Sequence, residues 1–190
     1  EERVRRIATA ITERDADLAE ELIRTDFEID EMEVEIEEEC LKVMALHQPV
    51  AIDLRFLVAV IKINNDLERI ADETVNIAQR IKTMTKDRPA SFVFDYDPMS
   101  AEVENMLKLS LDALVNMDVD TAFKVVTMDD DVDSTHRQVY QLIRNEMAHH
   151  PDQMAFLINF YLISRHLERI GDHATNIAEE VIYLIEGEIV

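Results

Sequence analysis

Four pairs of acidic residues in this sequence have the spacing of neighbouring positions on one face of a helix. The pairs are Asp26 with Asp30, Glu68 with Asp72, Asp129 with Asp133 and Glu168 with Asp172. Residues four apart on a helix lie one above the other. Carboxylates repeated on facing helices hold metal pairs in helical bundles, and oxygen ligands suit magnesium, manganese and iron. We therefore predict that these carboxylates form metal sites.

Two metal-free interpretations of the acidic pairs stay open. In so acidic a chain, such pairs more often belong to a solvated helix surface. Arg69 and Arg169 each follow a glutamate, and they supply a second alternative in which the carboxylates are held in ion pairs. His136, three positions after Asp133, is an additional candidate ligand. The Glu-x-x-His sequence at 146–149 occurs once, whereas di-iron bundles need it twice.

Two of the acidic pairs lie in a segment that occurs twice, one hundred residues apart. Leu67–Ala78 reads LERIADETVNIA, Leu167–Ala178 reads LERIGDHATNIA, and eight of the twelve positions are identical. Several of the identical residues are polar, which a shared hydrophobic rhythm would not require. The chain is therefore an internal duplication, and its two copies should carry similar sites.

The helical wheel of residues 17–46 favours a contacted acidic stripe. At about 100° per residue, Asp26 and Asp30 fall between two apolar stripes. These stripes consist of Ile23, Phe27, Val34 and Leu41, and of Leu22, Ile29, Ile36 and Val43. We expect the acidic pair to lie within the packing arc of this helix. The case for Glu68 and Asp72 is weaker, because they lie roughly opposite the main apolar stripe of their helix.

The pattern of breaks divides the chain into two similar halves. Helices are expected over residues 1–13, 17–46 and 50–86 of the first half, with an aspartate N-cap in the joint at 14–17. Residues 87–99 contain two prolines and interrupt the periodicity, with Phe92 and Phe94 as anchors of a connector. Helices then run over 100–117, from the joint at 118–120 to His149, and from the turn at 150–152 to about 185. Gly187 follows as a C-cap.

These elements predict an all-α fold. It consists of six helices in two tandem, pseudo-symmetric, antiparallel three-helix bundles. The expected domains are a first bundle over 1–86, a connector over 87–99 and a second bundle over 100–190. The first helix is short beside its counterpart at 100–117, so we expect the chain to be the body of a longer protein.

Composition excludes several classes of function. The formal charge of −22 and the lack of basic patches disfavour a nucleic-acid partner. No run of apolar residues is long enough to span a membrane, and no signal-peptide pattern is present. The single cysteine, Cys40, fits a reducing compartment. The sequence has two glycines, no P-loop and no nucleophile constellation, which argues against an enzyme.

Several segments together resemble the PhoU family of phosphate-signalling regulators. They are the two LERIxDxxxNIA segments, QPVAIDLR at 48–55, MDDDVD at 128–133 and EEVIYL at 179–184. The resemblance covers nearly the whole chain. It implies two similar three-helix bundles, as the periodicity also predicts.

The resemblance also implies metal binding at the acidic pairs. Family members carry E/D-x-x-x-D motifs that in some members bind multinuclear metal clusters, often iron. All four motif copies are complete here, which implies one surface metal site per bundle, with iron, zinc, manganese or magnesium as the ion.

The function implied by the resemblance is that of a non-enzymatic, cytoplasmic negative regulator of the phosphate starvation response. Such a protein links subunits of the phosphate-specific ABC transporter to a sensor histidine kinase, and it meets the membrane only through these partners. Family members are often homodimers, but no feature of this sequence fixes the oligomeric state. The alternatives are a carboxylate-bridged metalloenzyme and a metal-free helical scaffold.

Overall fold

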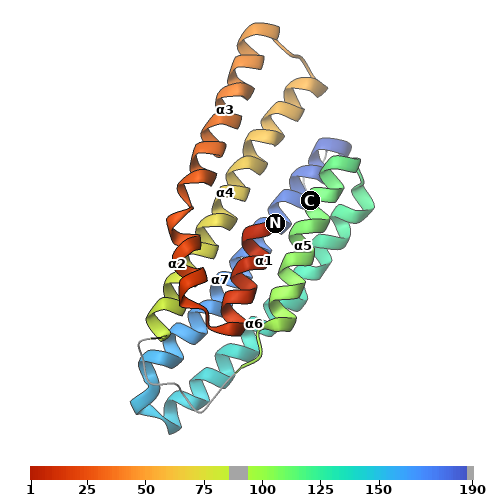
Figure 1. The fold of residues 1–190 in the computed structure, drawn as a ribbon. Helices are drawn as coiled ribbons and strands as arrows, with labels where there is room; N and C mark the ends of the chain where they lie inside the picture. The colour runs from red at the N-terminus through yellow and green to blue at the C-terminus, as the bar shows by residue number, and fades with distance from the viewer. Residues whose placement is uncertain (86–93, 188–190) are drawn as a thin grey trace.

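The structure is a computed structural model that describes residues 1–85 and 94–187. Its elements are α1 (Glu2–Glu13), α2 (Ala16–Arg24), α3 (Phe27–His47), α4 (Ile52–Met84), α5 (Asp97–Asn116), α6 (Val119–His149), the short 3-10 helix η1 (Pro151–Gln153) and α7 (Met154–Glu186). The described residues form helices and no strands, which confirms the all-α prediction. The helices lie roughly along one long axis (Figure 1).

The same joint begins the second long segment of each half. Asp15 accepts hydrogen bonds from two backbone N–H groups in the first turn of α2, and Asp118 does the same for α6. The residue before each aspartate has a left-handed conformation, with φ of 53° at Arg14 and 51° at Met117. An aspartate at this place satisfies amide groups that otherwise lack partners in a helix. The predicted N-cap in the first joint is therefore confirmed, and the duplication extends to local geometry.

The helix predicted over 17–46 is interrupted, which corrects the sequence-based boundary. Arg3 donates from Nη2 to the backbone carbonyl of Leu22 at 2.8 Å. In an uninterrupted helix that carbonyl would accept from the N–H of Asp26. Arg3 also donates to the hydroxyl of Thr25 at 3.3 Å. The chain therefore ends α2 at Arg24 and begins α3 at Phe27.

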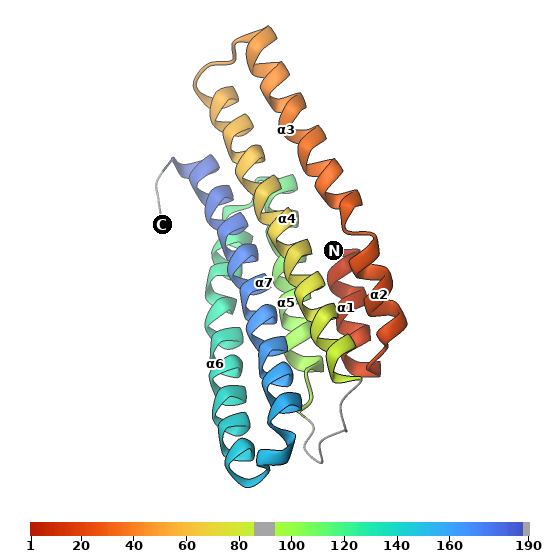
Figure 2. The same ribbon diagram turned by 90° about the vertical axis from the view of Figure 1, so that its left-hand side faces the viewer.

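The upper part of α3 and the start of α4 extend beyond the other helices as a hairpin (Figures 1 and 2). Within the fully described α3, Cys40 is the one buried residue. Phe27, Val34 and Leu41, which form one predicted apolar stripe, are 54%, 52% and 53% exposed. Among the described residues, α3 packs mainly against α4, so one side of it is covered and the others face solvent. The expected packing arc is therefore largely uncovered along α3.

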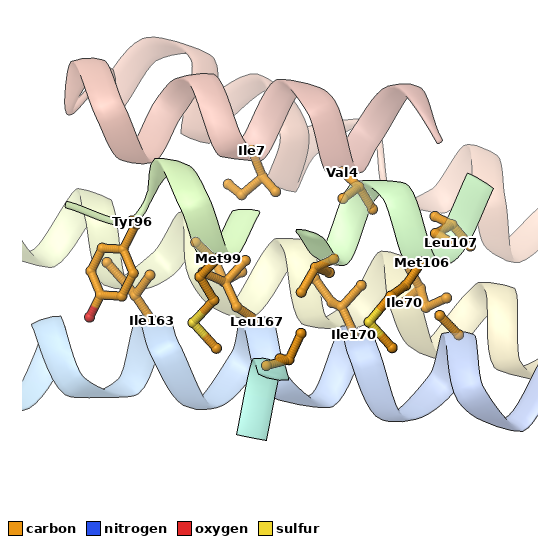
Figure 3. Close-up of a cluster of buried hydrophobic side chains, with 14 of the residues drawn as sticks. Val4, Ile7, Ile70, Tyr96, Met99, Met106, Leu107, Ile163, Leu167 and Ile170 are labelled. Carbon is orange, nitrogen blue, oxygen red and sulfur yellow. The ribbon is translucent and has the colours of Figure 1, made fainter. Parts of the chain in front are cut away.

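The two halves share one hydrophobic core. Figure 3 shows that Ile7 of α1, Ile70 of α4, Met106 of α5 and Ile170 of α7 meet in the same cluster. Each of these side chains is at most 4% exposed. Full burial of a large apolar side chain contributes about 1.5–3 kcal/mol, so this shared cluster holds the halves together. The division into domains at 87–99 stays a prediction.

One predicted anchor of the connector, Phe94, lies within the described residues. Phe92 lies outside the described residues. The ring of Phe94 makes an edge contact with Tyr96 at 5.0 Å between centroids, and the Tyr96 hydroxyl donates to the carbonyl of Phe160 at 2.5 Å. At the other end of α7, Gly187 has a left-handed φ of 76° and donates to the carbonyl of Tyr183. The predicted glycine C-cap is thus confirmed.

The described helices do not meet the requirements of a membrane span. Each helix within 1–85 and 94–187 is too short or too polar to cross a bilayer.

Candidate functional site

The first acidic pair is joined to α1 by an ion pair. Nη2 of Arg3 lies 2.8 Å from Oδ1 of Asp26, and the two side chains are 15% and 21% exposed. Burial raises the pKa of Asp26, Arg3 opposes this rise, and the charges of Asp30 and Asp72 add to it. Asp30 itself is exposed. The structure thus provides Asp26 with a cationic partner that the sequence pattern did not indicate.

The second pair of the first half lies on α4 beside Arg69, as the metal-free alternative predicts. Arg69 Nε is 3.5 Å from Glu68 Oε2, and its Nη1 is 3.4 Å from Asp72 Oδ2. Burial and the charge of Asp72 raise the pKa of Glu68, while Arg69 opposes the rise. The charge of Asp72 also raises the pKa of Asp26, so these two carboxylates of the first half act on each other. Each acidic pair of the first half thus has an arginine beside it.

The four predicted ligands of the second half lie on two neighbouring helices. Asp129 and Asp133 lie on α6, while Glu168 and Asp172 lie on α7. Loss of solvent raises the pKa of Asp129, Glu168 and Asp172, and the charges of the other carboxylates of this group raise it further. Opposing charges from Arg165, Arg169 and His173 reduce the rise only in part. The acidic pairs on α6 and α7 therefore converge in one region of negative charge.

The surroundings of this region are open and polar. A shallow hollow of about 420 Å³ is lined by Asp129, Asp172 and Asn176, among other residues. Asp133 forms an ion pair with Arg137 at 3.0 Å on the exposed side of α6. Two of the four carboxylates, Asp129 and Asp172, thus line this hollow.

His136 and Gly171 have structural roles next to the carboxylates. His136 Nδ1 lies 3.0 Å from the hydroxyl of Ser164, and its ring stacks on Tyr161. Burial lowers the pKa of His136, so the neutral ring is favoured. A Cβ at Gly171 would lie 3.5 Å from Val132 and 3.6 Å from an oxygen of Asp129. The small residue therefore lies where α6 and α7 approach each other.

The donor set decides whether the acidic pairs fit a metal ion. The four acidic pairs offer only carboxylates, which suits an oxygen-binding cation. In the part of the chain that the structure describes, no three histidine, cysteine, aspartate or glutamate side chains are placed so that they could hold a metal ion. The chemistry of the donors fits, and metal binding stays a prediction.

A second set of polar contacts, between α4 and α7, was not predicted from the sequence. Glu73 lies 2.7 Å from Nδ1 of His166, and Asp66 lies 2.9 Å from Nδ1 of His173. The signal was present in the repeat, because each carboxylate of the first copy stands where the second copy has a histidine. Such contacts become visible only when the packing of the two copies is known.

Comparison with known proteins places these features in a family. The sequence profile described as the PhoU domain matches residues 1–81 and 97–181. The phosphate-specific transport system accessory protein PhoU homolog of Clostridium acetobutylicum is 38% identical over 180 residues, which cover 94% of this chain and 82% of the relative. The homolog from Aquifex aeolicus, which carries the same description, is 37% identical over 100% of this chain and 86% of its own length.

Solved structures agree with the sequence comparison. The crystal structure of PhoU from Pseudomonas aeruginosa superposes with a TM-score of 0.94 at 34% identity, over 98% of this chain and 90% of that one. The phosphate transport system regulatory protein PhoU from Streptococcus pneumoniae gives a TM-score of 0.87 at 26% identity, over 100% of this chain and 89% of that one. Sequence and architecture therefore point to the same relatives.

Proposed function

The chain belongs to the PhoU family, and on this premise we propose that it is an accessory protein of a phosphate-specific transport system and regulates phosphate transport. The observation that carries this proposal is the match to the Clostridium acetobutylicum relative, which is 38% identical over 94% of this chain and is described as such an accessory protein. The agreement extends along the repeats, so it reflects the whole architecture and not one motif.

The mode of action that we propose is that of a non-enzymatic adaptor. It would act as a negative regulator on the cytoplasmic side, between the transporter subunits and a sensor histidine kinase. The α3–α4 hairpin supports such a role, because it carries exposed apolar side chains among many acidic ones. Exposed apolar surface rimmed by polar residues is typical of protein interaction sites.

For the acidic pairs, we propose that the second half holds the stronger cation site. Burial raises the pKa of Asp129, Glu168 and Asp172, and the charges of neighbouring carboxylates raise it further. A bound cation would relieve this repulsion. When bound, a cation would supply positive charge that crosslinks α6 and α7. In the first half, Arg3 pairs with Asp26, and Arg69 lies beside both Glu68 and Asp72, whereas in the second half Arg137 pairs with Asp133 on the exposed side of α6. This observation favours the metal-free scaffold as a second candidate role for the first half.

A reporter experiment tests the regulatory role. In a bacterial strain that lacks its own PhoU-type protein, we expect a phosphate-starvation reporter to stay high under ample phosphate. Expression of this chain should lower it. A chain that is expressed and folded, copurifies with the transporter subunits and leaves the reporter high would contradict negative regulation. A chain that also fails to copurify with any transporter subunit would contradict the accessory role itself.

Metal content of the purified protein tests the acidic pairs separately. We expect ions to be lost in the Asp129→Asn/Asp172→Asn variant and largely kept in the Asp26→Asn/Asp72→Asn variant. Mass spectrometry after reconstitution with iron, zinc or manganese measures this. Equal loss in both variants would refute the difference between the halves, and metal-free protein throughout would leave the scaffold role for both. We expect no metal-dependent catalytic turnover in the parent protein. A turnover that is present in the parent protein and disappears in the Glu68→Gln variant would revive the metalloenzyme alternative.

A further inference from the structure

The polar contacts between α4 and α7 follow a symmetric pattern. The two helices lie side by side and run in opposite directions (Figure 2). Glu73 Oε2 is 2.7 Å from His166 Nδ1, and Glu73 Oε1 is 3.1 Å from Arg169 Nε. Asp66 Oδ1 is 2.9 Å from His173 Nδ1. It also accepts from Asn176 Nδ2 at 3.2 Å. Each carboxylate thus receives a histidine and a second donor that lies one turn further along α7.

The duplication relates these two contacts to each other. Positions 66 and 73 of the first copy are equivalent to positions 166 and 173 of the second copy. Exchanging the two copies therefore converts the contact of Asp66 with His173 into the contact of Glu73 with His166. The two contacts are related by the internal twofold symmetry of the helix pair. In both of them the carboxylate is on α4 and the histidine is on α7.

The second donors to the two carboxylates, Arg169 and Asn176, are of the same residue type in both copies of the repeat. The positions of Arg169 and Asn176 carry the same residue types in the first copy, as Arg69 and Asn76. Among the residues that make these contacts, the two copies differ only in carrying carboxylates or histidines at the equivalent positions. The choice of carboxylate or histidine therefore decides which faces are complementary.

The contacts are shielded enough for a mismatch to be costly. The Glu73 side chain is 5% exposed, and His166, Asp66 and His173 are 15%, 16% and 16% exposed. The contacts of Glu73 with His166 and Arg169 compensate its charge within the helix interface. A buried carboxylate that faces another carboxylate would lose this compensation.

We propose that this division of residues makes the α4 and α7 faces of the two halves specific for each other. If the first-half face met a second copy of itself, the same twofold relation would bring Asp66 opposite Glu73. If the second-half face met itself, His166 would lie opposite His173. Each half therefore docks on the unlike half and rejects its own kind, even though the repeats share most of their interface residues. This specificity holds whatever the proposed function of the protein.

Exchange of the four residues in the full chain tests the proposal. The acid-only variant, His166→Asp/His173→Glu, places carboxylates on both faces. The exchanged variant adds Asp66→His and Glu73→His, so that carboxylates lie on α7 and histidines on α4. We expect the acid-only variant to lose at least about tenfold in the folding equilibrium constant at neutral pH, and the exchanged variant to regain most of it. Urea unfolding measures both.

A control and a milder variant pair make the test decisive. The control His47→Asp/His149→Asp changes the net charge equally at exposed histidines. If the acid-only chain does not fold, the same exchange is made at the single contact of Asp66 with His173, with His173→Asp as the mismatch and Asp66→His/His173→Asp as the exchange. The proposal is supported if the mismatched chain is less stable than the control and the exchanged chain regains most of the lost stability. An exchanged chain that is no more stable than its mismatched parent, or a mismatched chain as stable as the control, would overturn it.

Discussion

Replacing Arg3 by methionine tests how the first acidic pair is held. The substitution keeps the apolar stem and removes three contacts of the guanidinium: with Asp26 Oδ1 at 2.8 Å, with the Leu22 carbonyl at 2.8 Å and with the Thr25 hydroxyl at 3.3 Å. It also leaves the carboxylate of Asp26, which is 21% exposed, without its cation. Both losses should destabilise the junction of α1, α2 and α3.

The size of the effect follows from these contacts. The charged guanidinium is the donor in all three contacts, and a hydrogen bond with a charged group contributes about 1.5–3 kcal/mol. The cost of burying the guanidinium offsets part of this sum. Partial exposure of both side chains places the ion pair at the low end of this range. We therefore expect Arg3→Met to lower the free energy of unfolding by about 2–3 kcal/mol, without added metal. Urea unfolding at neutral pH, followed by circular dichroism, measures this change.

The matched control for this variant is Arg5→Met. Arg5 lies on the same helix and pairs with Glu2, but the side chains are 63% and 62% exposed. Exposed pairs contribute about 0–1 kcal/mol, so the control should be close to the parent protein. If Arg3→Met and Arg5→Met are equally stable, the reasoning that Arg3 neutralises Asp26 and interrupts the helix is refuted. If Arg3→Met also gains manganese affinity at the first half, the arginine has been competing with the cation.

Further predictions concern the remaining carboxylates and the repeat. Because the pKa of Glu73 is lowered on folding, its contribution to stability is present above the pKa of an unfolded glutamate and is lost as pH falls through the folded value; Glu73→Gln should flatten this part of a stability–pH curve. The pKa of Asp129 is raised, so its ionised form destabilises the metal-free protein at neutral pH and falling pH relieves this; Asp129→Asn should raise the urea midpoint in the presence of chelator, and a lower midpoint would contradict the assignment. Gly171→Ala should stabilise by about 0.5–1 kcal/mol in thermal unfolding, because a Cβ there makes ordinary contacts and alanine favours helix; a loss of more than about 1 kcal/mol would mean that α6 and α7 cannot accept the methyl group.

The sequence was sufficient for the features that depend on local or repeated patterns. Helical periodicity and the aspartate caps predicted the helices, because both signals lie within a few residues of the elements that they define. The repeated LERI segments predicted that Glu168 and Asp172 would have counterparts in Glu68 and Asp72. The metal site expected on the second-half carboxylates stays a prediction.

Features that depend on distant residues could not be predicted in this way. The break before α3 rests on Arg3, which reaches Leu22 and Asp26 from another helix. The exposure of Phe27 depends on which helices pack against α3, which the wheel of a single helix does not contain. The pairing of Glu73 with His166 needed the relative placement of the two copies. In each case the missing information was the three-dimensional neighbourhood of a residue.

The common core of the two halves has a consequence for the energetics of the whole molecule. Since Ile70 and Ile170 are packed in one cluster, we expect neither half to unfold while the other stays intact. A ligand that binds only the folded state then stabilises both halves at once, wherever it binds. Occupation of a site on one repeat would therefore protect the amides of the other repeat from hydrogen exchange through global opening, including amides that lie far from the site. The two repeats of such a protein therefore unfold as one cooperative unit, and a ligand bound to either repeat stabilises that whole unit.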